Sequence, residues 1–198
     1  MARVTAEDRR KQLVAAAFRV IGRDGFARAT TRAICTEAQA PLAAFHYCFA
    51  SKQELLTELT NQTLADLAAA RADGTHIRGG VAESLRATLR YYWQTVEDDP
   101  GRESVLMALT QHVLGDPGLA GVAEHQYAAY HRIARETLEE IGAGCGIAWT
   151  LPVEQLARML VVVTDGVTLA WLVDHDSTAA VAALDAFAVG LAIYATVL

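Results

Sequence analysis

Hydrophobic residues recur at helical spacing along most of this chain, in segments separated by short breaks rich in glycine, proline and aspartate. The first segment, over 5–24, places four apolar residues on one side of a helix: Leu13, Ala17, Val20 and Ile21. Gly25 follows where a left-handed residue commonly ends a helix. Similar patterns predict helices over 51–72, 81–98, 102–114, 119–141, 153–173 and 178–197, with a linker over 73–80. With 53 % apolar residues, the chain is predicted to be an all-α protein.

Residues 28–52 contain two short helices separated by a tight break. Thr30 or Thr31 caps the first helix, because a threonine hydroxyl accepts a hydrogen bond from an unpaired N–H of the first turn. The break falls at 39–41, since Pro41 cannot continue a helix but suits the start of the next one.

The second of these helices covers 42–49 and has barely two turns. Its pattern turns Phe45 and Phe49 inward and leaves His46 and Tyr47 outward. Two short helices joined by such a turn form a helix-turn-helix, whose second helix can enter the major groove of DNA.

The run from Arg9 to Leu56 resembles the N-terminal DNA-binding domain of TetR-family transcriptional repressors. Four pieces agree with that family in order and spacing: RRKQLVAAAFRVIGRDGF, TTRAICTEA, FHYCF and SKQELL. The resemblance implies a three-helix DNA-binding domain over 1–52 and a helical effector-binding and dimerisation domain over 53–198. It also implies a bacterial one-component repressor that binds a palindromic double-stranded DNA operator as a homodimer and is released by a small molecule.

Residue chemistry and the resemblance together predict the DNA contacts: Thr31, Arg32, Leu42, Ala43, Ala44, His46, Tyr47 and Lys52. Thr31, Tyr47 and Lys52 are expected to hold phosphates. Arg32 and His46 are expected to reach base edges. The run Leu42-Ala43-Ala44 replaces residues that donate hydrogen bonds in many family members, so its expected contacts are thymine methyl groups. The common Gly-Val-Ser turn of the family is likewise replaced, by Gln39-Ala40-Pro41.

Four neighbouring residues carry simpler expectations. Ser51 is expected to cap the next helix, and Cys48 to fill the core. Arg9 and Arg10 are expected either near phosphates or on a solvated face.

Charge is distributed unevenly along the chain. Residues 1–52 carry nine Lys and Arg against four acidic residues, whereas the remainder carries eight against nineteen. Residues 1–52, called the head, therefore carry a net charge of +5, and residues 53–198, called the body, carry −11, which gives −6 for the whole chain. A basic head on an acidic body is typical of a duplex-binding domain attached to a domain with another task.

The last two predicted helices, over 153–173 and 178–197, are apolar nearly all round. Such helices must be buried, and the resemblance implies that they pack on the same pair of a second subunit. The segment 178–198 also resembles a membrane span, but its single charge, Asp185, would cost roughly 2.5–3.5 kcal/mol at the bilayer centre. The prediction is a homodimer interface and no membrane.

The middle helices carry polar and aromatic groups among apolar ones, as a small-molecule site requires. The predicted ligand-binding residues are Trp93, Met107, Gln111, His112, Tyr127 and His131. No cofactor is expected. A kink is predicted at 164–166, where Asp165 is either a buried acid bonded to a hydroxyl or backbone group, or a ligand contact.

Other classes of function remain open. A metal-responsive regulator would use His112, His125 and His131, but no pair has the four-residue spacing that places two ligands on one helix face, so no metal site is expected. A helical ligand-binding protein with a degenerate head is a further alternative, motivated by the apolar run 42–44. An enzyme is not expected, because no Ser-His-Asp order, phosphate loop or paired carboxylates stand out.

Three cysteines without regular spacing indicate reduced thiols. The N-terminus lacks the apolar core of a signal peptide. Both features predict a cytoplasmic protein.

Overall fold

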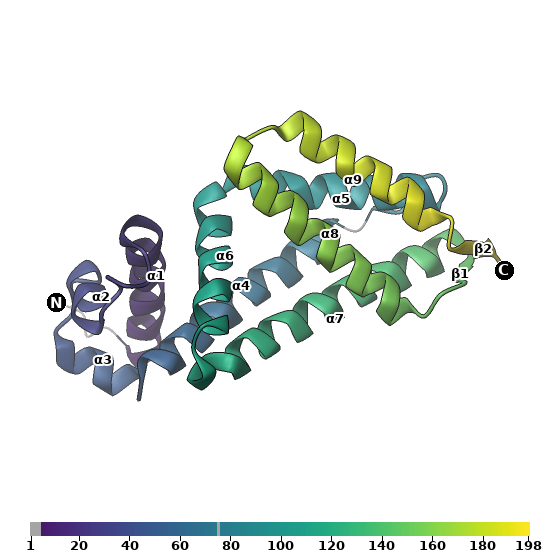
Figure 1. The fold of residues 1–198 in the computed structure, drawn as a ribbon. Coiled ribbons are helices and arrows are strands. Elements are labelled where there is room, and N and C mark those ends of the chain that lie inside the picture. The colour runs from purple at the N-terminus through teal and green to yellow at the C-terminus, as the bar shows by residue number, and fades with distance from the viewer. Residues whose placement is uncertain (1–4, 75) are drawn as a thin grey trace. The chain divides into compact units, whose positions relative to one another are not determined.

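A computed structural model describes residues 5–74 and 76–198 (Figure 1). The described part is helical apart from one short two-stranded ribbon, which confirms the predicted all-α class. The elements are α1 Ala6–Asp24, α2 Thr31–Glu37, α3 Leu42–Cys48, α4 Lys52–Gly74, α5 Val81–Asp98, α6 Pro100–Leu114, the 3-10 turn η1 Pro117–Leu119, α7 Ala120–Cys145, β1 Ile147–Trp149, α8 Val153–Asp174, α9 Ser177–Ala192 and β2 Ala195–Val197.

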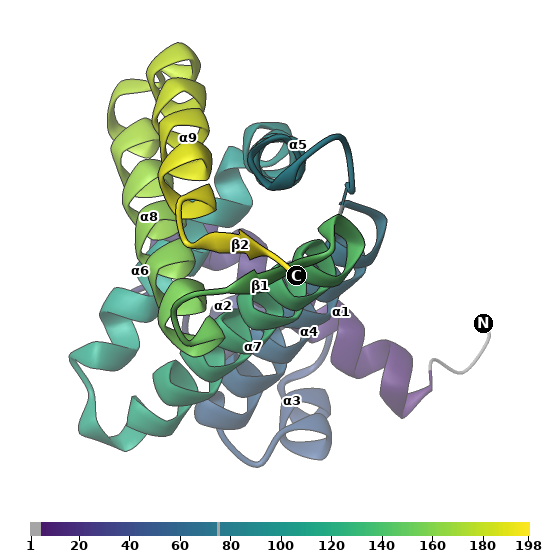
Figure 2. The ribbon, with the colours of Figure 1, turned by 90° about the vertical axis from the view of Figure 1, so that its right-hand side faces the viewer.

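Four helix boundaries differ by two or more residues from the prediction, and one of them is the end of α4 at Gly74, inside the predicted linker 73–80. Helix α6 begins at Pro100, because the missing N–H of proline costs nothing in a first turn. Helix α7 continues through Gly142 and Gly144 to Cys145, past its predicted end at residue 141. Helix α9 ends at Ala192, and Ala195–Val197 then pairs antiparallel with Ile147–Trp149 (Figure 2). The ribbon was missed because three-residue strands are too short to show a period.

The chain divides into two compact units. The first comprises the described residues up to Thr63 together with Gly101–Gln126, and the second comprises those of Leu64–Pro100 together with Tyr127–Leu198. This division does not follow the predicted boundary after residue 52, because α4 is uninterrupted there and α6 shares the core of the first unit. The functional division into 1–52 and 53–198 stays a prediction.

The core of the first unit joins α1, α2, α3 and the start of α4 to α6. Its fully buried side chains include Leu13, Ile34, Phe45, Phe49, Leu55, Leu56, Leu59 and Leu109. The close approach of α1 and α6 depends on Gly22, where a Cβ would lie 3.2 Å from a methyl group of Val105.

The second unit packs α5, α8, α9 and the C-terminal half of α7 around one core. The aromatic pair Trp93 and Trp171 lies inside it, with ring centroids 5.3 Å apart. Asp185, the single charge of the last helix, pairs with Arg90 of α5 at 2.9 Å, and that guanidinium holds the pKa of the carboxyl below its usual range. The charge that counted against a membrane span therefore links α9 to α5.

The turn between α2 and α3 depends on an unusual backbone conformation. Gln39 has φ of 51°, in the left-handed region, and the N–H of Ala40 donates to the carbonyl of Cys35 at 2.9 Å. Pro41 then precedes α3 with φ of −65°. The predicted break at 39–41 is confirmed, with Gln39 where glycine would be favoured.

Substitution of Gln39 tests this turn. Valine should lower the free energy of unfolding by about 1–2 kcal/mol, because a β-branched side chain fits the left-handed region poorly. Glycine should leave that free energy within about 0.5 kcal/mol or raise it, since relief of strain offsets the added freedom of the unfolded chain. Urea titration at one protein concentration measures both.

Gln62→Val is the matched control, because Gln62 is exposed inside α4. There the same change should cost only about 0.5 kcal/mol of helix propensity. An equal loss at both positions would contradict the assigned role of the turn.

Candidate nucleic-acid interface

The two short helices are positioned by their buried side chains. Ile34 of α2 and Phe45 of α3 are 0 % and 2 % exposed, and Phe49 directly after α3 is 1 % exposed. The inward positions of Phe45 and Phe49 are thus confirmed. Thr30, rather than Thr31, caps α2, since its hydroxyl accepts from the N–H of Ala33 at 3.2 Å.

The outward positions on α3 form one face of the helix. Leu42 and His46 are one turn apart, as are Ala43 and Tyr47, and all four are exposed. Tyr47 reaches 79 % exposure. Arg32 is exposed as well, whereas Thr31, Ala44 and Lys52 are half-buried. The eight predicted DNA-contacting residues therefore lie on α2, α3 and the first residue of α4, outside the core.

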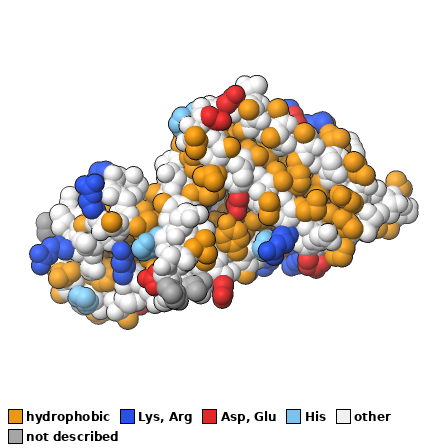
Figure 3. Space-filling model, in the orientation of Figure 1, with side chains coloured by type: hydrophobic (Ala, Val, Ile, Leu, Met, Phe, Trp, Pro, Cys, Tyr) orange, Lys and Arg blue, Asp and Glu red, His pale blue; other side chains and the backbone are white. Residues whose placement is uncertain are grey.

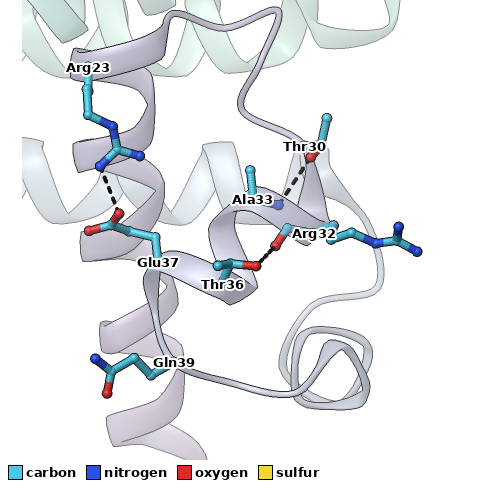
Figure 4. Close-up of a pocket in the computed structure, with 7 residues that line it drawn as sticks. All are labelled: Arg23, Thr30, Arg32, Ala33, Thr36, Glu37 and Gln39. Carbon is cyan, nitrogen blue, oxygen red and sulfur yellow. Dashed lines mark hydrogen bonds and ion pairs between the residues drawn. The ribbon is translucent and has the colours of Figure 1, made fainter.

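A surface hollow of about 620 Å³ lies beside α2. Its lining residues are Arg23, Thr30, Arg32, Ala33, Thr36, Glu37 and Gln39 (Figure 4). Glu37 accepts from Arg19 at 2.7 Å and from Arg23 at 2.9 Å, and these two cations lower the pKa of its carboxyl. The guanidinium of Arg32 points away from that cluster and has no hydrogen bond or ion pair among residues 5–74 and 76–198 (Figure 4). Its charge is thus available to an outside partner.

Arg10 has a different environment from the one expected near phosphates. Its guanidinium donates to the carbonyl of Cys48 and to Glu54 at 3.0 Å, and lies 4.3 Å from the ring centroid of Phe49. Glu58 adds a further contact at 3.4 Å. Arg10 therefore ties α1 to the end of α3 and to α4. Cys48 is buried, in agreement with its expected core role.

The start of α4 is capped as expected. The hydroxyl of Ser51 accepts from the N–H of Glu54 at 3.1 Å, and the Glu54 carboxylate accepts from the N–H of Ala50 at 2.8 Å. Lys52 lies at the first position of this helix, where burial lowers the pKa of its ammonium group. A phosphate beside Lys52 would offset that desolvation.

The six predicted ligand-binding residues are divided between the two units. Three lie in the first unit, namely Met107, Gln111 and His112, and three in the second, namely Trp93, Tyr127 and His131. His112 stacks on Phe26 with ring centroids 4.6 Å apart, and Gln111 is exposed. The division arises because α6 belongs to the first unit, whereas α5 and the part of α7 from Tyr127 onward belong to the second.

In the second unit, Tyr127 and His131 lie together, with ring centroids 6.2 Å apart. The Tyr127 hydroxyl donates to Asp165 of α8 at 2.8 Å, and burial raises the pKa of both groups. Thr168, one turn further along α8, lies 3.3 Å from the hydroxyl of Tyr92. For Asp165, the bond to the Tyr127 hydroxyl agrees with the first of its two predicted roles, a buried acid bonded to a hydroxyl group, and a ligand contact stays a prediction. Thr168 was not predicted, although a second polar residue three positions along an apolar helix was an available signal.

Helix α8 is continuous from Val153 to Asp174, so it is not interrupted at 164–166, and the predicted kink stays a prediction. The proposed histidine set is also separated: His112 and His125 belong to the first unit and His131 to the second. Within the described ranges, no group of three His, Cys, Asp or Glu side chains could hold a metal ion.

Comparison with known proteins gives matches over both parts of the chain. The profile of "Bacterial regulatory proteins, tetR family" matches residues 13–59, and that of "BetI-type transcriptional repressor, C-terminal" matches 81–193. The nicotine-responsive transcriptional repressor HdnoR of Paenarthrobacter nicotinovorans is 31 % identical over 181 residues, which cover 87 % of this chain and 88 % of that protein. The regulator BetI of Agrobacterium fabrum is 36 % identical over 92 residues, 46 % of this chain and 45 % of BetI.

Solved structures share the fold. The Bacillus subtilis regulator FadR, in complex with stearoyl-CoA, has a TM-score of 0.74 at 16 % identity and covers 91 % of this chain and 96 % of its own. A transcriptional regulator from Rhodococcus sp. Rha1 has a TM-score of 0.74 at 22 % identity, and the match covers 96 % of this chain and 98 % of that protein.

Proposed function

The chain belongs to the TetR family of bacterial transcriptional regulators and is a ligand-responsive repressor, and we propose that it binds a palindromic operator as a homodimer. The observation that carries this proposal is the exposed face of α3 beside the free guanidinium of Arg32. Such a helix, held by the buried core of the first unit and accompanied by the cation of Arg32, which is unpaired among the described residues, suits the major groove. The regulator is placed in the cytoplasm, where its operator lies.

The eight exposed or half-buried residues have separate roles in this proposal. Thr31, Tyr47 and Lys52 hold phosphates and set the register on the duplex. Arg32 and His46 read base edges. The apolar residues Leu42, Ala43 and Ala44 contact thymine methyl groups.

The homodimer is proposed to form through α8 and α9. Val162, Leu169 and Val173 share one stripe of α8 and are 63 %, 54 % and 79 % exposed. Val189 and Ile193 add apolar surface at 48 % and 76 % exposure, and hydrophobic side chains gather over α8 and α9 in Figure 3. Helix α8 is long and apolar enough to cross a membrane by length and composition alone, but a second copy of the same surface accounts for its exposed stripe.

A twofold dimer also matches a twofold operator. Two heads then meet half-sites about one helical turn or a multiple apart. An effector bound in the body favours the dimer conformation whose heads no longer match that spacing, and DNA is released through differential affinity. The relative HdnoR is named as nicotine-responsive, so nicotine is the first effector to test.

Selection of bound duplexes from a random pool, at two salt concentrations, tests the operator proposal. We expect a palindromic motif whose affinity falls steeply with salt, because each neutralised phosphate releases counterions. Lack of enrichment at either salt, with or without a metabolite extract, would favour a ligand-binding protein with a degenerate head.

On the selected motif, Arg32→Ala should weaken binding by about 1–3 kcal/mol and relax specificity at one position of each half-site. Lys52→Ala should weaken binding to all sequences and reduce the salt slope by about one per subunit. Fluorescence anisotropy at several salt concentrations separates the two effects.

Arg135→Ala serves as the control, since it removes one positive charge from α7, where Arg135 pairs with Glu139. It should leave both specificity and salt slope unchanged. Full retention of affinity by the Arg32→Ala, Lys52→Ala double variant would refute these contact assignments.

Val173→Asp tests the dimer interface. Twofold symmetry brings two new carboxylates into one apolar surface, so the dimer Kd should rise more than about a hundredfold. Sedimentation equilibrium measures this Kd, and operator affinity should fall with it. Leu114→Asp is the control, because Leu114 is 67 % exposed on α6. A dimer unchanged by Val173→Asp would exclude this face.

A further inference from the structure

Helix α8 carries two polar residues, one turn apart, toward its neighbours in the second unit. Asp165 accepts from the Tyr127 hydroxyl of α7 at 2.8 Å. Thr168 is fully buried and lies 3.3 Å from the Tyr92 hydroxyl of α5. A polar row therefore runs where α5, α7 and α8 of this unit meet.

Asp165 has few partners for a carboxylate. Its two oxygens can accept about four hydrogen bonds, yet Tyr127 is its one hydrogen-bond donor in the described ranges, and no described Lys or Arg pairs with it. The contrast is Asp185 of the same unit, which has Arg90 at 2.9 Å and Arg86 at 3.7 Å. Burial raises the pKa of the Asp165 carboxyl, and the Tyr127 hydroxyl and the nearby His131 offset only part of that rise.

Two further rings lie beside the tyrosine that binds this acid. The Tyr127 ring, whose hydroxyl meets Asp165, lies 5.6 Å from Tyr130 and 6.2 Å from His131 between ring centroids. Aromatic faces attract organic cations through their quadrupoles and also pack against apolar groups. A carboxylate beside such rings is the arrangement that recognises a cation with an apolar body.

A second polar group in the same core has no partner. Trp93 is 2 % exposed, and its Nε1 is the buried side-chain atom without a hydrogen bond in the described part of the chain. Its ring packs on Trp171, six residues beyond Asp165, which corresponds to about 9 Å along the helix axis. An ammonium cannot accept this hydrogen bond, so the Nε1 of Trp93 lies outside the proposed cation site.

Asp165 lies at the border between the buried and the exposed sides of α8. On α8 it lies between the buried side of Val161 and Thr168 and the exposed stripe of Val162 and Leu169, and it is half-buried itself. A ligand cation can thus meet Asp165 without passing through the core.

We propose that the effector is a small organic amine, whose ammonium pairs with Asp165 while its apolar part packs on Tyr127, Tyr130 and His131. This inference rests on the proposed ligand-responsive function and specifies the class of ligand. The ammonium donates to the Asp165 carboxylate on α8, and the apolar part contacts the aromatic residues on α7. The ligand therefore contacts both helices. Because α8 also carries the proposed dimer stripe, the ligand has a direct route to the subunit interface.

Calorimetry on the full-length protein at neutral pH, without DNA, tests the site with matched probes. Benzylamine is compared with benzyl alcohol, and cyclohexylmethylamine with cyclohexylmethanol, since each pair differs mainly in charge. We expect the amines to bind about ten- to a hundredfold more tightly than the alcohols, as for a charge-assisted hydrogen bond. Equal binding by the wild-type protein would overturn the proposal.

Two variants and one control locate the effect. Asp165→Asn keeps an acceptor for Tyr127 but removes the charge, and it should abolish the preference for amines. Tyr127→Phe keeps the charge and removes the competing hydroxyl, and it should retain the preference. Glu139→Gln removes an exposed acid from α7 and should change nothing. Preference for amines that survives in Asp165→Asn would also overturn the proposal.

Operator binding, measured separately, distinguishes this inference from the proposed function. Operator binding without any amine preference would leave the regulator intact and remove the amine site. An amine preference without operator binding would do the reverse.

Discussion

Burial of the aromatic residues at the end of α3 is the constraint on which the head depends. A helix of seven residues is not stable in water by itself, so α3 exists because Phe45 and Phe49 are enclosed by the core of the first unit. That enclosure leaves the opposite face of α3 exposed. Arg10 stabilises the same packing at the end of α3, because its guanidinium lies over the ring of Phe49 and donates a hydrogen bond to Glu54 of α4. The surface proposed for DNA is a consequence of what the core buries.

Charge is used differently on the two sides of the head. Arg19 and Arg23 of α1 are bound to Glu37, so their charges are largely neutralised within the protein. Arg32 has no such partner among the described residues. A cation held in an internal ion pair must break that pair to reach a phosphate, whereas a free guanidinium pays no such cost. The net charge of a segment therefore overstates the charge that it can offer to DNA.

Asp165 of α8 and Asp185 of α9, both in the second unit, show the same distinction. Asp185 has arginine partners and links α9 to α5. Asp165 has a tyrosine hydroxyl and neighbouring aromatic rings. The first arrangement is complete without a ligand, and the second leaves capacity for an outside cation. Because α8 carries both Asp165 and the exposed apolar stripe, effector binding and dimer geometry share one rigid element in the proposed function.

The sequence by itself determined the helical class, the helix-turn-helix, the inward phenylalanines and the cap at Ser51, and it reduced the cap of α2 to Thr30 or Thr31. These features follow from local periodicity and local hydrogen bonding, which neighbouring residues specify. The order and spacing of four sequence motifs were also sufficient to identify the family. Only the tertiary structure decided that Arg10 lies in an internal network, that α6 belongs to the first core and that the ribbon closes the second unit. Only it placed Tyr127 against Asp165, 38 positions apart. Such pairings depend on which long-range surfaces are buried together, and no local pattern encodes that choice.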